Sequence, residues 1–590
     1  MRRVSLLLAL LAGAATAQQT TDAVQPEIST PVAAAAVSPA VAAAYAAKAA
    51  GQPVEAARWM VAAANPLAVE AGAAVLARGG SAADALIAVQ LVLGLVEPQS
   101  SGLGGGAFLV WYDAATGALT TLDARETAPL AATPLLFLDE QGQPLKFFDA
   151  VVGGRSVGTP GTPALLEAMH RRWGRLPWTT LFDPAIALAR EGFAVSDRLN
   201  ALIAEDRDRL ASAPGTADYF LTEAGEPLPV GHLLQNPDYA DTLRLMAQGG
   251  AAAFYTGPVA ADIVRVVQGA PGNPGVLAAT DLALYQVKER DPVCTAYRVY
   301  QVCGMGPPSS GGIAVGQILG ALNGAPMGAA DDPETWRRIG DASRLAFADR
   351  ERFVADSDFG PVPSRGLLDP AYLAGRAALL ETDMALQDAP PGTPEFDHAA
   401  LADGEAIELP STSHVTIVDR YGNVAAMTAS IENVFGARLM VRGFLLNNEL
   451  TDFSFRSHKD GVPIANRVEP GKRPRSSMAP TVVMKDGKPV LAIGSPGGSR
   501  IIGYVAQAII AWADWGMDVQ QAVAMGHGLN RFGTFDLEAG TTAAGLKDGL
   551  EAAGFEVKVL DLNSGLHAIE IGAMLTGGAD PRREGIALGD

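Results

Sequence analysis

The sequence has few residues of the kinds that bind metal ions. It contains two cysteines and seven histidines among 590 residues. No His-Glu-x-x-His and no Cys-x-x-Cys spacing occurs, and these are common zinc-binding patterns. We therefore expect no metal site and no cofactor.

The two cysteines, Cys294 and Cys303, leave the question of a disulfide open. If the residues between them formed one extended strand, the two would lie roughly 30 Å apart, too far for a bridge. A hairpin could bring them together, but no strong turn residue stands between them.

The chain also lacks long apolar runs beyond its N-terminus and lacks an excess of basic residues. Its net charge is −20, which argues against nucleic acid and anionic membranes as partners. Hydrophobic residues make up 48% and charged residues 18%, proportions typical of a globular protein. The length allows a large core, in one large domain or in several.

The N-terminus has the pattern of a secretory signal peptide over residues 1–17. Arg2 and Arg3 precede the apolar residues 4–12, and the small residues 15–17 fit a cleavage site. We expect export, to the periplasm or outside the cell. No cysteine stands directly after this segment, so we expect no lipoprotein anchor.

Residues 18–54 are rich in alanine and proline and predict a loosely ordered lead-in, with folded structure beginning near Glu55. Ser81, three residues before Asp84, is predicted to cap a helix.

Strand patterns occur at residues 107–123, helix patterns dominate between about 160 and 390, and strands return over 412–500. Helices are predicted again at 501–515 and 519–525. These blocks predict an α+β fold with helices packed on sheets, such as an αββα arrangement.

Thr412 stands at the start of a predicted strand after a polar loop that contains proline and glycine. The β-branched residues 415–418 favour a strand, residues 420–423 a turn, and residues 424–428 the returning strand. Taken alone, this is an ordinary hairpin with a surface threonine. If the chain is cut before Thr412, however, that residue carries both a hydroxyl nucleophile and a free α-amine that can serve as its base.

Four further motifs, taken in order with Thr412, closely resemble the γ-glutamyltransferase family of N-terminal nucleophile hydrolases. The resemblance runs from about residue 55 to the C-terminus. It implies a four-layer αββα fold and a precursor that cuts itself between Ser411 and Thr412. A large subunit (55–411 after the lead-in) and a small catalytic subunit (412–590) would then form a heterodimer. The motifs are residues 122–129, 443–454, 472–481 and 494–500.

The resemblance implies catalytic roles for four residues. Thr412 would be the nucleophile and, through its α-amine, the base; an α-amine has a reference pKa of about 8, which suits that role. Gly497 and Gly498 would form the oxyanion hole. Ser430 stands where the family commonly has a threonine that binds the nucleophile, and it keeps a hydroxyl.

The same resemblance implies how a substrate would be held. Arg125, Ser476 and Ser477 would bind its α-carboxylate, and Asp452 its α-ammonium. Other readings remain for each residue: a salt bridge from Arg125 to Glu126 or Asp123, turn-capping serines, and an exposed loop acid at Asp452.

Two further acids depart from the family pattern or extend it. Glu432 replaces an expected asparagine, and Glu449 stands where glutamine or glutamate occurs. With Asp452 they would place three carboxylates around one ammonium. Such a site binds a cation strongly, keeps one acid protonated, or serves a different substrate.

Three functions are therefore open to the sequence. The first is a γ-glutamyl transferase and hydrolase acting on glutathione and related compounds. The second is a glutaryl or cephalosporin-type acylase on the same scaffold, which Glu432 favours and Asp452 opposes. The third is a non-catalytic exported binding protein, against which the intact Thr412 counts.

Overall fold

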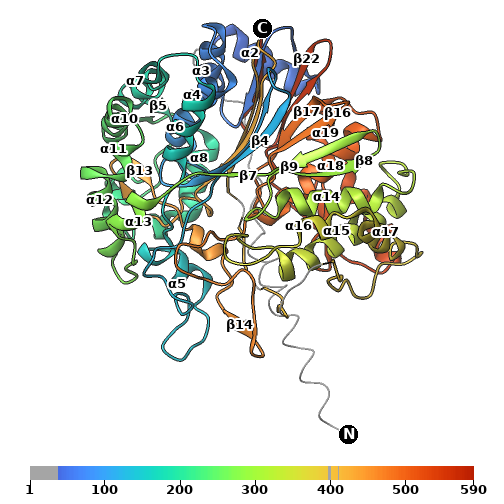
Figure 1. Cartoon of the computed structure of the whole chain (residues 1–590). Helices are drawn as coiled ribbons and strands as arrows, with labels where there is room; N and C mark the ends of the chain where they lie inside the picture. Colours follow the sequence, from blue (N-terminus) through green and yellow to red (C-terminus); the bar gives the residue numbers. More distant parts are fainter. Residues whose placement is uncertain (1–36, 396–399, 405, 410) are drawn as a thin grey trace.

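Two antiparallel seven-stranded sheets form the centre of the molecule (Figure 1). The computed structural model describes residues 37–395, 400–404, 406–409 and 411–590. The expected signal peptide and the first half of the lead-in lie outside the described residues. The first sheet consists, in order, of β23 (Ile586–Gly589), β2 (Met60–Ala63), β10 (Ser413–Val418), β11 (Val424–Ser430), β3 (Gly106–Asp113), β4 (Ala118–Ala124) and β7 (Lys288–Arg290).

The second sheet packs face to face on the first. Its strands, in order, are β1 (Val54–Ala56), β22 (Leu575–Ala579), β21 (His567–Ile571), β17 (Lys488–Gly494), β16 (Thr481–Lys485), β9 (Tyr300–Gly304) and β8 (Val293–Tyr297). Between the sheets lies an apolar layer to which both contribute, for example Val110 and Ala426 from one and Val482 and Ile569 from the other.

Helices cover the two outer faces (Figure 1). The first sheet is covered by α3 (Pro66–Ala77), α4 (Ala82–Val96), α6 (Thr162–Trp173), α7 (Asp183–Glu191) and α10 (Pro237–Gly249). The second is covered by α14 (Gly311–Leu322), α15 (Pro333–Phe353), α18 (Ile501–Ala513) and α19 (Val519–Ala524). The predicted four-layer αββα fold is confirmed. No helix in the described part of the chain has the length and apolar character needed to cross a membrane.

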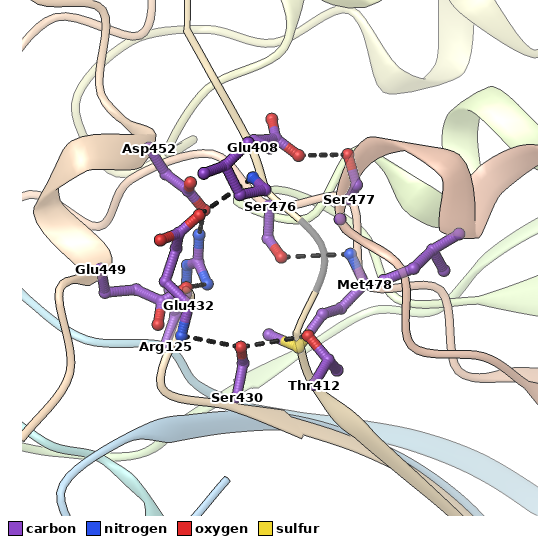
Figure 2. Close-up of a pocket in the computed structure, with 13 residues that line it drawn as sticks. Arg125, Glu408, Thr412, Ser430, Glu432, Glu449, Asp452, Ser476, Ser477 and Met478 are labelled. Carbon is purple, nitrogen blue, oxygen red and sulfur yellow. Dashed lines mark hydrogen bonds and ion pairs between the residues drawn. The ribbon is translucent and has the colours of Figure 1, made fainter. Parts of the chain in front are cut away.

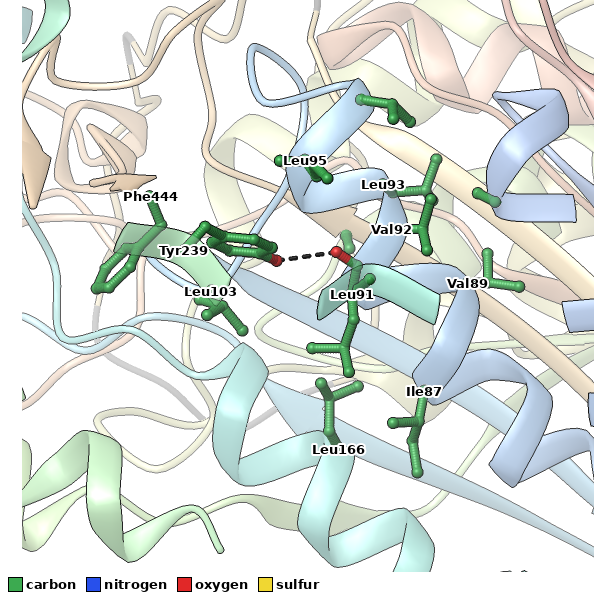
Figure 3. Packing of buried hydrophobic residues seen from close by; sticks show 14 of the residues in the cluster. Ile87, Val89, Leu91, Val92, Leu93, Leu95, Leu103, Leu166, Tyr239 and Phe444 are labelled. Carbon is green, nitrogen blue, oxygen red and sulfur yellow. Dashed lines mark hydrogen bonds between the residues drawn. The ribbon is translucent and has the colours of Figure 1, made fainter. Parts of the chain in front are cut away.

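Helix α4 shows why a strongly apolar stretch becomes an internal helix here. Ser81 and Asp84 form the predicted capping box, which satisfies backbone N–H groups at the helix start. Every residue of α4 is buried, as expected of a helix that is apolar on all sides. The Tyr239 hydroxyl of α10 donates to the Leu91 carbonyl at 2.9 Å, within the apolar packing that Figure 3 shows.

Strands β10 and β11 form the predicted hairpin, in the middle of the first sheet rather than at the surface. Ser413 pairs with Ala429, so Thr412 lies opposite Ser430 at the open end of the hairpin. Thr412 is only 4% exposed, which excludes the reading as a surface threonine.

The prediction of a loosely ordered lead-in through residue 54 is wrong for its second half. Residues 39–49 form helix α2 (Pro39–Ala49), which packs on β23 with Val41 and Ala44 buried. Its alanines are strong helix formers, Ser38 caps its first turn and Pro39 occupies the first helical position. Alanine- and proline-rich composition alone favours a linker, whereas Ser38 and Pro39 are signals for the start of a helix.

Cys294 and Cys303 form a disulfide across the β8–β9 hairpin. They lie directly opposite each other with their Cα atoms 4.1 Å apart. The turn needs no glycine, because Arg298 adopts a φ of 54° between the paired residues Tyr297 and Tyr300. The hairpin alternative is therefore the correct one.

Candidate active site

A small cavity, with a volume of about 20 Å³, lies where β10 begins and β11 ends (Figure 2). It contains nine of the ten predicted site residues, drawn from segments far apart in the sequence; Gly497 precedes the lining residue Gly498. The lining residues are Arg125, Glu408, Leu409, Thr412, Ser430, Glu432, Glu449, Asp452, Ser476, Ser477, Met478, Gly498 and Ile501.

The Thr412 hydroxyl is held by its neighbour across the hairpin. Its Oγ1 lies 3.1 Å from the Ser430 Oγ, and that oxygen also accepts the Glu432 backbone N–H at 2.9 Å. The Thr412 carbonyl accepts from the Arg583 guanidinium at 3.2 Å. The serine thus makes the contact to the nucleophile that the resemblance implied.

The backbone of Thr412 is strained in the intact chain. Its φ is 118°, a region that β-branched residues rarely adopt and that costs on the order of 1–3 kcal/mol. The angle φ is defined through the preceding carbonyl carbon, that of Ser411. Cutting the Ser411–Thr412 bond would remove this constraint, so the strain favours cleavage at that bond.

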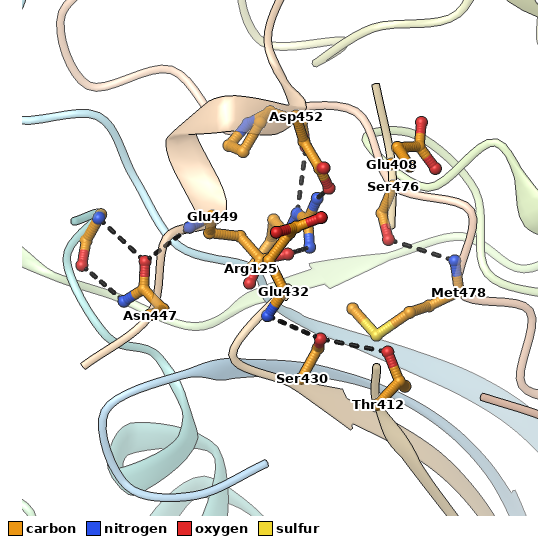
Figure 4. Close-up of polar contacts among 12 residues, drawn as sticks. Arg125, Glu408, Thr412, Ser430, Glu432, Asn447, Glu449, Asp452, Ser476 and Met478 are labelled. Carbon is orange, nitrogen blue, oxygen red and sulfur yellow. Dashed lines mark hydrogen bonds and ion pairs between the residues drawn. The ribbon is translucent and has the colours of Figure 1, made fainter. Parts of the chain in front are cut away.

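Arg125 joins two of the predicted acids (Figure 4). Glu449 and Asp452 stand at the two ends of the short helix η3 (Glu449–Asp452), and both form buried salt bridges with the Arg125 guanidinium. The guanidinium also donates to the carbonyls of Pro474 at 3.2 Å and Arg475 at 2.8 Å. Arg125 thus forms salt bridges, as the alternative reading of the sequence proposed, but with Glu449 and Asp452 instead of Glu126 or Asp123.

Four buried carboxyl groups lie on this side of the cavity: Glu126, Glu449 and Asp452 around the Arg125 guanidinium, and Glu432 beside Glu449. Burial raises the pKa of all four, and repulsion between the acids raises those of Glu126, Glu432 and Asp452 further. The pKa of Glu432 is raised to about 8, by burial and by the Glu449 charge. This side of the cavity therefore holds more acids than it can ionise, and a ligand cation would stabilise their charged forms.

The two predicted serines behave differently. The Ser476 hydroxyl accepts the Met478 N–H at 3.1 Å, which is a turn-capping contact. The Ser477 hydroxyl instead donates to the carboxylate of Glu408 and accepts from Arg350 at 2.8 Å. Ser477 thus already binds a carboxylate, and that carboxylate is the side chain of Glu408 in the same chain.

The glycine pair follows β17 and opens the turn η4 (Gly498–Arg500) that leads into α18. Gly497 and Gly498 have φ of 134° and 57°, conformations that favour glycine. A Cβ on Gly498 would lie 2.8 Å from the Leu409 carbonyl carbon. A peptide carbonyl therefore packs directly against this loop, where backbone N–H groups can serve an oxyanion.

Sequence reasoning missed Glu408, Arg350 and Arg583. Glu408 lies in the acidic loop before Thr412, and nothing in that loop distinguishes it from its neighbours. Arg350 is one of several arginines on α15. Only the fold shows that these side chains converge on Ser477 and Thr412.

The family model described as gamma-glutamyltranspeptidase matches residues 68–590. The chain belongs to the γ-glutamyltranspeptidase family. It is 40% identical over 475 residues to a glutathione hydrolase proenzyme of Bacillus subtilis, which covers 79% of each chain.

Two solved structures are also similar. A cephalosporin acylase from Bacillus halodurans has a TM-score of 0.81 at 25% identity and covers 95% of this chain and 99% of its own. The gamma-glutamyltranspeptidase of Helicobacter pylori has a TM-score of 0.55 at 35% identity and covers 57% of this chain and 96% of its own.

Proposed function

We propose that the protein is a γ-glutamyltransferase and glutathione hydrolase made as a self-cleaving precursor. It forms a γ-glutamyl ester on Thr412 and passes the acyl group to water or to the amine of an amino acid or peptide. The observation that best supports this function is that Thr412 and Ser430 lie in one cavity with several buried carboxyl groups and a carboxylate-binding serine. The α-ammonium and α-carboxylate of a γ-glutamyl group would match the carboxyl groups and the serine, respectively.

Maturation uses the same hydroxyl. Thr412 Oγ1 attacks the Ser411 carbonyl carbon, the C–N bond breaks, and the acyl group moves from nitrogen to oxygen. Water then hydrolyses the ester, leaving a carboxylate on Ser411 and an α-amine on Thr412. Residues 55–411 and 412–590 stay together as a heterodimer, since β10 and β11 remain paired with β2 and β3.

In the mature enzyme the Thr412 α-amine takes the hydroxyl proton as Oγ1 attacks the γ-amide carbonyl. Backbone N–H groups of Gly497 and Gly498 stabilise the oxyanion, and one such donor is worth roughly 3 kcal/mol. The amine then protonates the departing amino group. Water or an acceptor amine completes the cycle by the reverse sequence of proton transfers.

The second candidate is an acylase for glutaryl or cephalosporin-type amides, favoured by the likeness to the cephalosporin acylase structure. A glutaryl group has the same carboxylate as a γ-glutamyl group but no ammonium, so it would leave the buried acids without a ligand cation. The γ-glutamyl reading is therefore the better one. A non-catalytic binding protein would not need the strained Thr412 or its contact with Ser430.

Kinetics with γ-glutamyl-p-nitroanilide and glutaryl-p-nitroanilide, with and without glycylglycine, separate the two enzymes. We expect faster turnover of the γ-glutamyl compound, and faster glutaryl turnover would reverse the assignment. On a gel, wild type should give two bands, the smaller one beginning at Thr412 by N-terminal sequencing, and Thr412→Ala one band. A wild type that stays single-chain would exclude self-cleavage.

We further propose export to the periplasm or beyond, on the basis of residues 1–17. Cell fractionation should recover the two subunits outside the cytoplasm, and a variant without residues 2–17 should stay inside.

A further inference from the structure

A fully buried serine outside the cavity lies between two parts of the candidate active site. The backbone carbonyl of Ser564 accepts the Arg583 Nε at 3.1 Å, and Arg583 in turn donates to the Thr412 carbonyl. A Cβ on the next residue, Gly565, would lie 2.6 Å from Pro496 and 2.7 Å from Arg583. The backbone at 564–565 therefore fits tightly between the start of the glycine loop and the arginine that contacts the nucleophile.

The Ser564 hydroxyl joins an aspartate to a histidine. It donates to the Asp580 carboxylate and lies 2.6 Å from the His527 Nε2. Burial raises the pKa of Asp580, but the charge of Arg582 outweighs that effect, and the pKa falls to about 2. Asp580 is therefore ionised and takes the single proton of the hydroxyl. His527 must then donate its Nε2–H to the serine, which fixes the orientation of its ring.

Asp580 is well suited to anchor this network. Its carboxylate also accepts from the Leu566 N–H at 3.1 Å and from the Arg582 side chain at 3.0 Å. Arg582 is itself held by two hydrogen bonds to the Glu538 carboxylate. Charge-assisted hydrogen bonds from several directions leave the carboxylate little freedom to move.

The oriented histidine packs on the residue beneath the glycine loop. The rings of His527 and Tyr504 have their centroids 4.4 Å apart at an angle of 47°. Tyr504 belongs to α18 and is fully buried. A Cβ on Gly497 would lie 2.7 Å from the Tyr504 ring, so the ring lies directly against the loop. The contacts thus connect five residues in order: Asp580, Ser564, His527, Tyr504 and Gly497.

We propose that Ser564 and His527 are positioning residues that hold the backbone of Gly497 and Gly498 in the conformation that binds the oxyanion. Neither residue lines the cavity, so both act through Tyr504 and not on the substrate. The inference rests on the proposed function, in which the N–H groups of the two glycines stabilise the oxyanion. Such donors are effective only when they are aimed before the reaction, and a loop without support aims them less well.

Two inhibitors of the mature enzyme distinguish positioning from general support of the fold. In 2-amino-4-boronobutanoic acid, a boronic acid replaces the γ-carboxyl group of glutamate. Its boron bonds to Thr412 Oγ1, the hydroxyl proton passes to the α-amine, and a boron oxygen takes the place of the oxyanion. L-Glutamate binds without forming such a group. Ser564→Ala should raise the Ki of the boronate about ten-fold and change that of L-glutamate by less than about two-fold.

Turnover of γ-glutamyl-p-nitroanilide should change in the same way. An oxyanion forms both when Thr412 is acylated and when the ester is hydrolysed, so a displaced loop slows the two steps alike. Ser564→Ala should therefore lower kcat about ten-fold and keep KM within about two-fold of wild type. Ser564→Thr keeps the hydroxyl and should restore most of kcat.

His527→Gln is the second variant, and it decides the question if Ser564→Ala does not mature. The glutamine amide can still donate to Ser564 but places no ring against Tyr504. This variant should also raise the boronate Ki and lower kcat, with little change in the Ki of L-glutamate.

Ser81→Ala is the matched control, because it removes an equally buried serine hydroxyl far from the glycine loop. Ser81 caps α4, and the next residue donates its N–H to Asp419, which directly follows the end of β10 opposite Thr412. The loss of this cap should lower the melting temperature. Both inhibition constants should stay at their wild-type values, since a Ki does not depend on the fraction of folded enzyme.

A wild-type boronate Ki in the Ser564 and His527 variants, or an equal rise for both inhibitors, would overturn the proposal. That outcome leaves the proposed function intact as long as wild type turns over γ-glutamyl-p-nitroanilide. Wild type without that activity would instead refute the proposed function.

Discussion

Ser430 is the single side chain that touches the nucleophile's hydroxyl in the intact chain, among the hydrogen bonds of the described residues. Ser430→Ala should slow both self-cleavage and γ-glutamyl turnover by about ten-fold, the effect of one lost hydrogen bond of roughly 1–1.5 kcal/mol at the reacting oxygen. Ser430→Thr keeps a hydroxyl and should restore most of both rates. A time course of small-subunit formation and kcat for γ-glutamyl-p-nitroanilide measure the two effects. Unchanged rates in the alanine variant would show that the contact does not contribute.

Glu432 should make the stability of the precursor depend on pH. Its pKa in the folded chain is about 8, against an ordinary value of 4.5, because it is buried beside Glu449. Between these values the unfolded chain has lost this proton while the folded chain keeps it. The free energy of unfolding should therefore fall as pH rises through this window, by up to ~1.4 kcal/mol per pH unit for one proton.

The measurement compares denaturant unfolding of Thr412→Ala with Thr412→Ala/Glu432→Gln at pH 5.5, 7 and 8. The glutamine cannot ionise, so the fall with pH should be smaller in the double variant. Glu140→Gln, at an exposed loop position, is the control and should leave the pH dependence unchanged. Identical slopes with and without Glu432 would contradict the prediction.

At the scale of elements, the Cys294–Cys303 disulfide joins the two strands of the β8–β9 hairpin at the edge of the second sheet. Strand β8 is the last strand of that sheet and has β9 as its one neighbour there. Replacing Cys294 and Cys303 together by serine should lower the free energy of unfolding by about 2–3 kcal/mol, the chain-entropy effect of closing a loop of this length. Neither residue lines the cavity, so turnover at 25 °C should persist. A loss of activity without a loss of stability would link this edge to the site.

Elements with strong local signals were predictable from the sequence. The capping residues Ser81 and Asp84 gave the start of α4, and the β-branched run before residue 419 gave β10. Helix α2 was missed because alanine-rich segments suit both linkers and packed helices, and only its packing on β23 decides between them. The disulfide depended on a turn in which an arginine takes a positive φ, which sequence patterns do not predict.

The candidate site likewise contains some residues that sequence motifs predict and others that they do not. Motifs in consecutive residues led to Arg125, Asp452, Ser477 and Gly498, which the fold brings to one cavity. Arg350 and Glu408 carry no local pattern. Their importance comes from a contact across 58 residues of sequence, which exists only once α15 has packed beside the cavity.

At the scale of the whole molecule, the first helix of the described chain packs on the last strand, β23, and on the residues just before it. The Lys48 ammonium of α2 donates to the carbonyls of Arg583 at 2.5 Å and Gly585 at 2.7 Å. The Arg583 side chain in turn donates to the Thr412 carbonyl. Helix α2 therefore supports the residue that holds the strained threonine in place.

Lys48→Met should leave two carbonyls without their donor, each costing about 1–3 kcal/mol where they are buried, and should slow maturation because Arg583 is held less firmly. Thermal unfolding in the Thr412→Ala background and the fraction cleaved after a fixed time measure the two effects. Lys488→Met, at an exposed lysine that begins β17, is the matched control and should match wild type in both assays. If Lys48→Met loses stability but matures at the normal rate, α2 supports the fold without influencing Thr412. If it loses neither, the contact between the two ends of the chain contributes nothing.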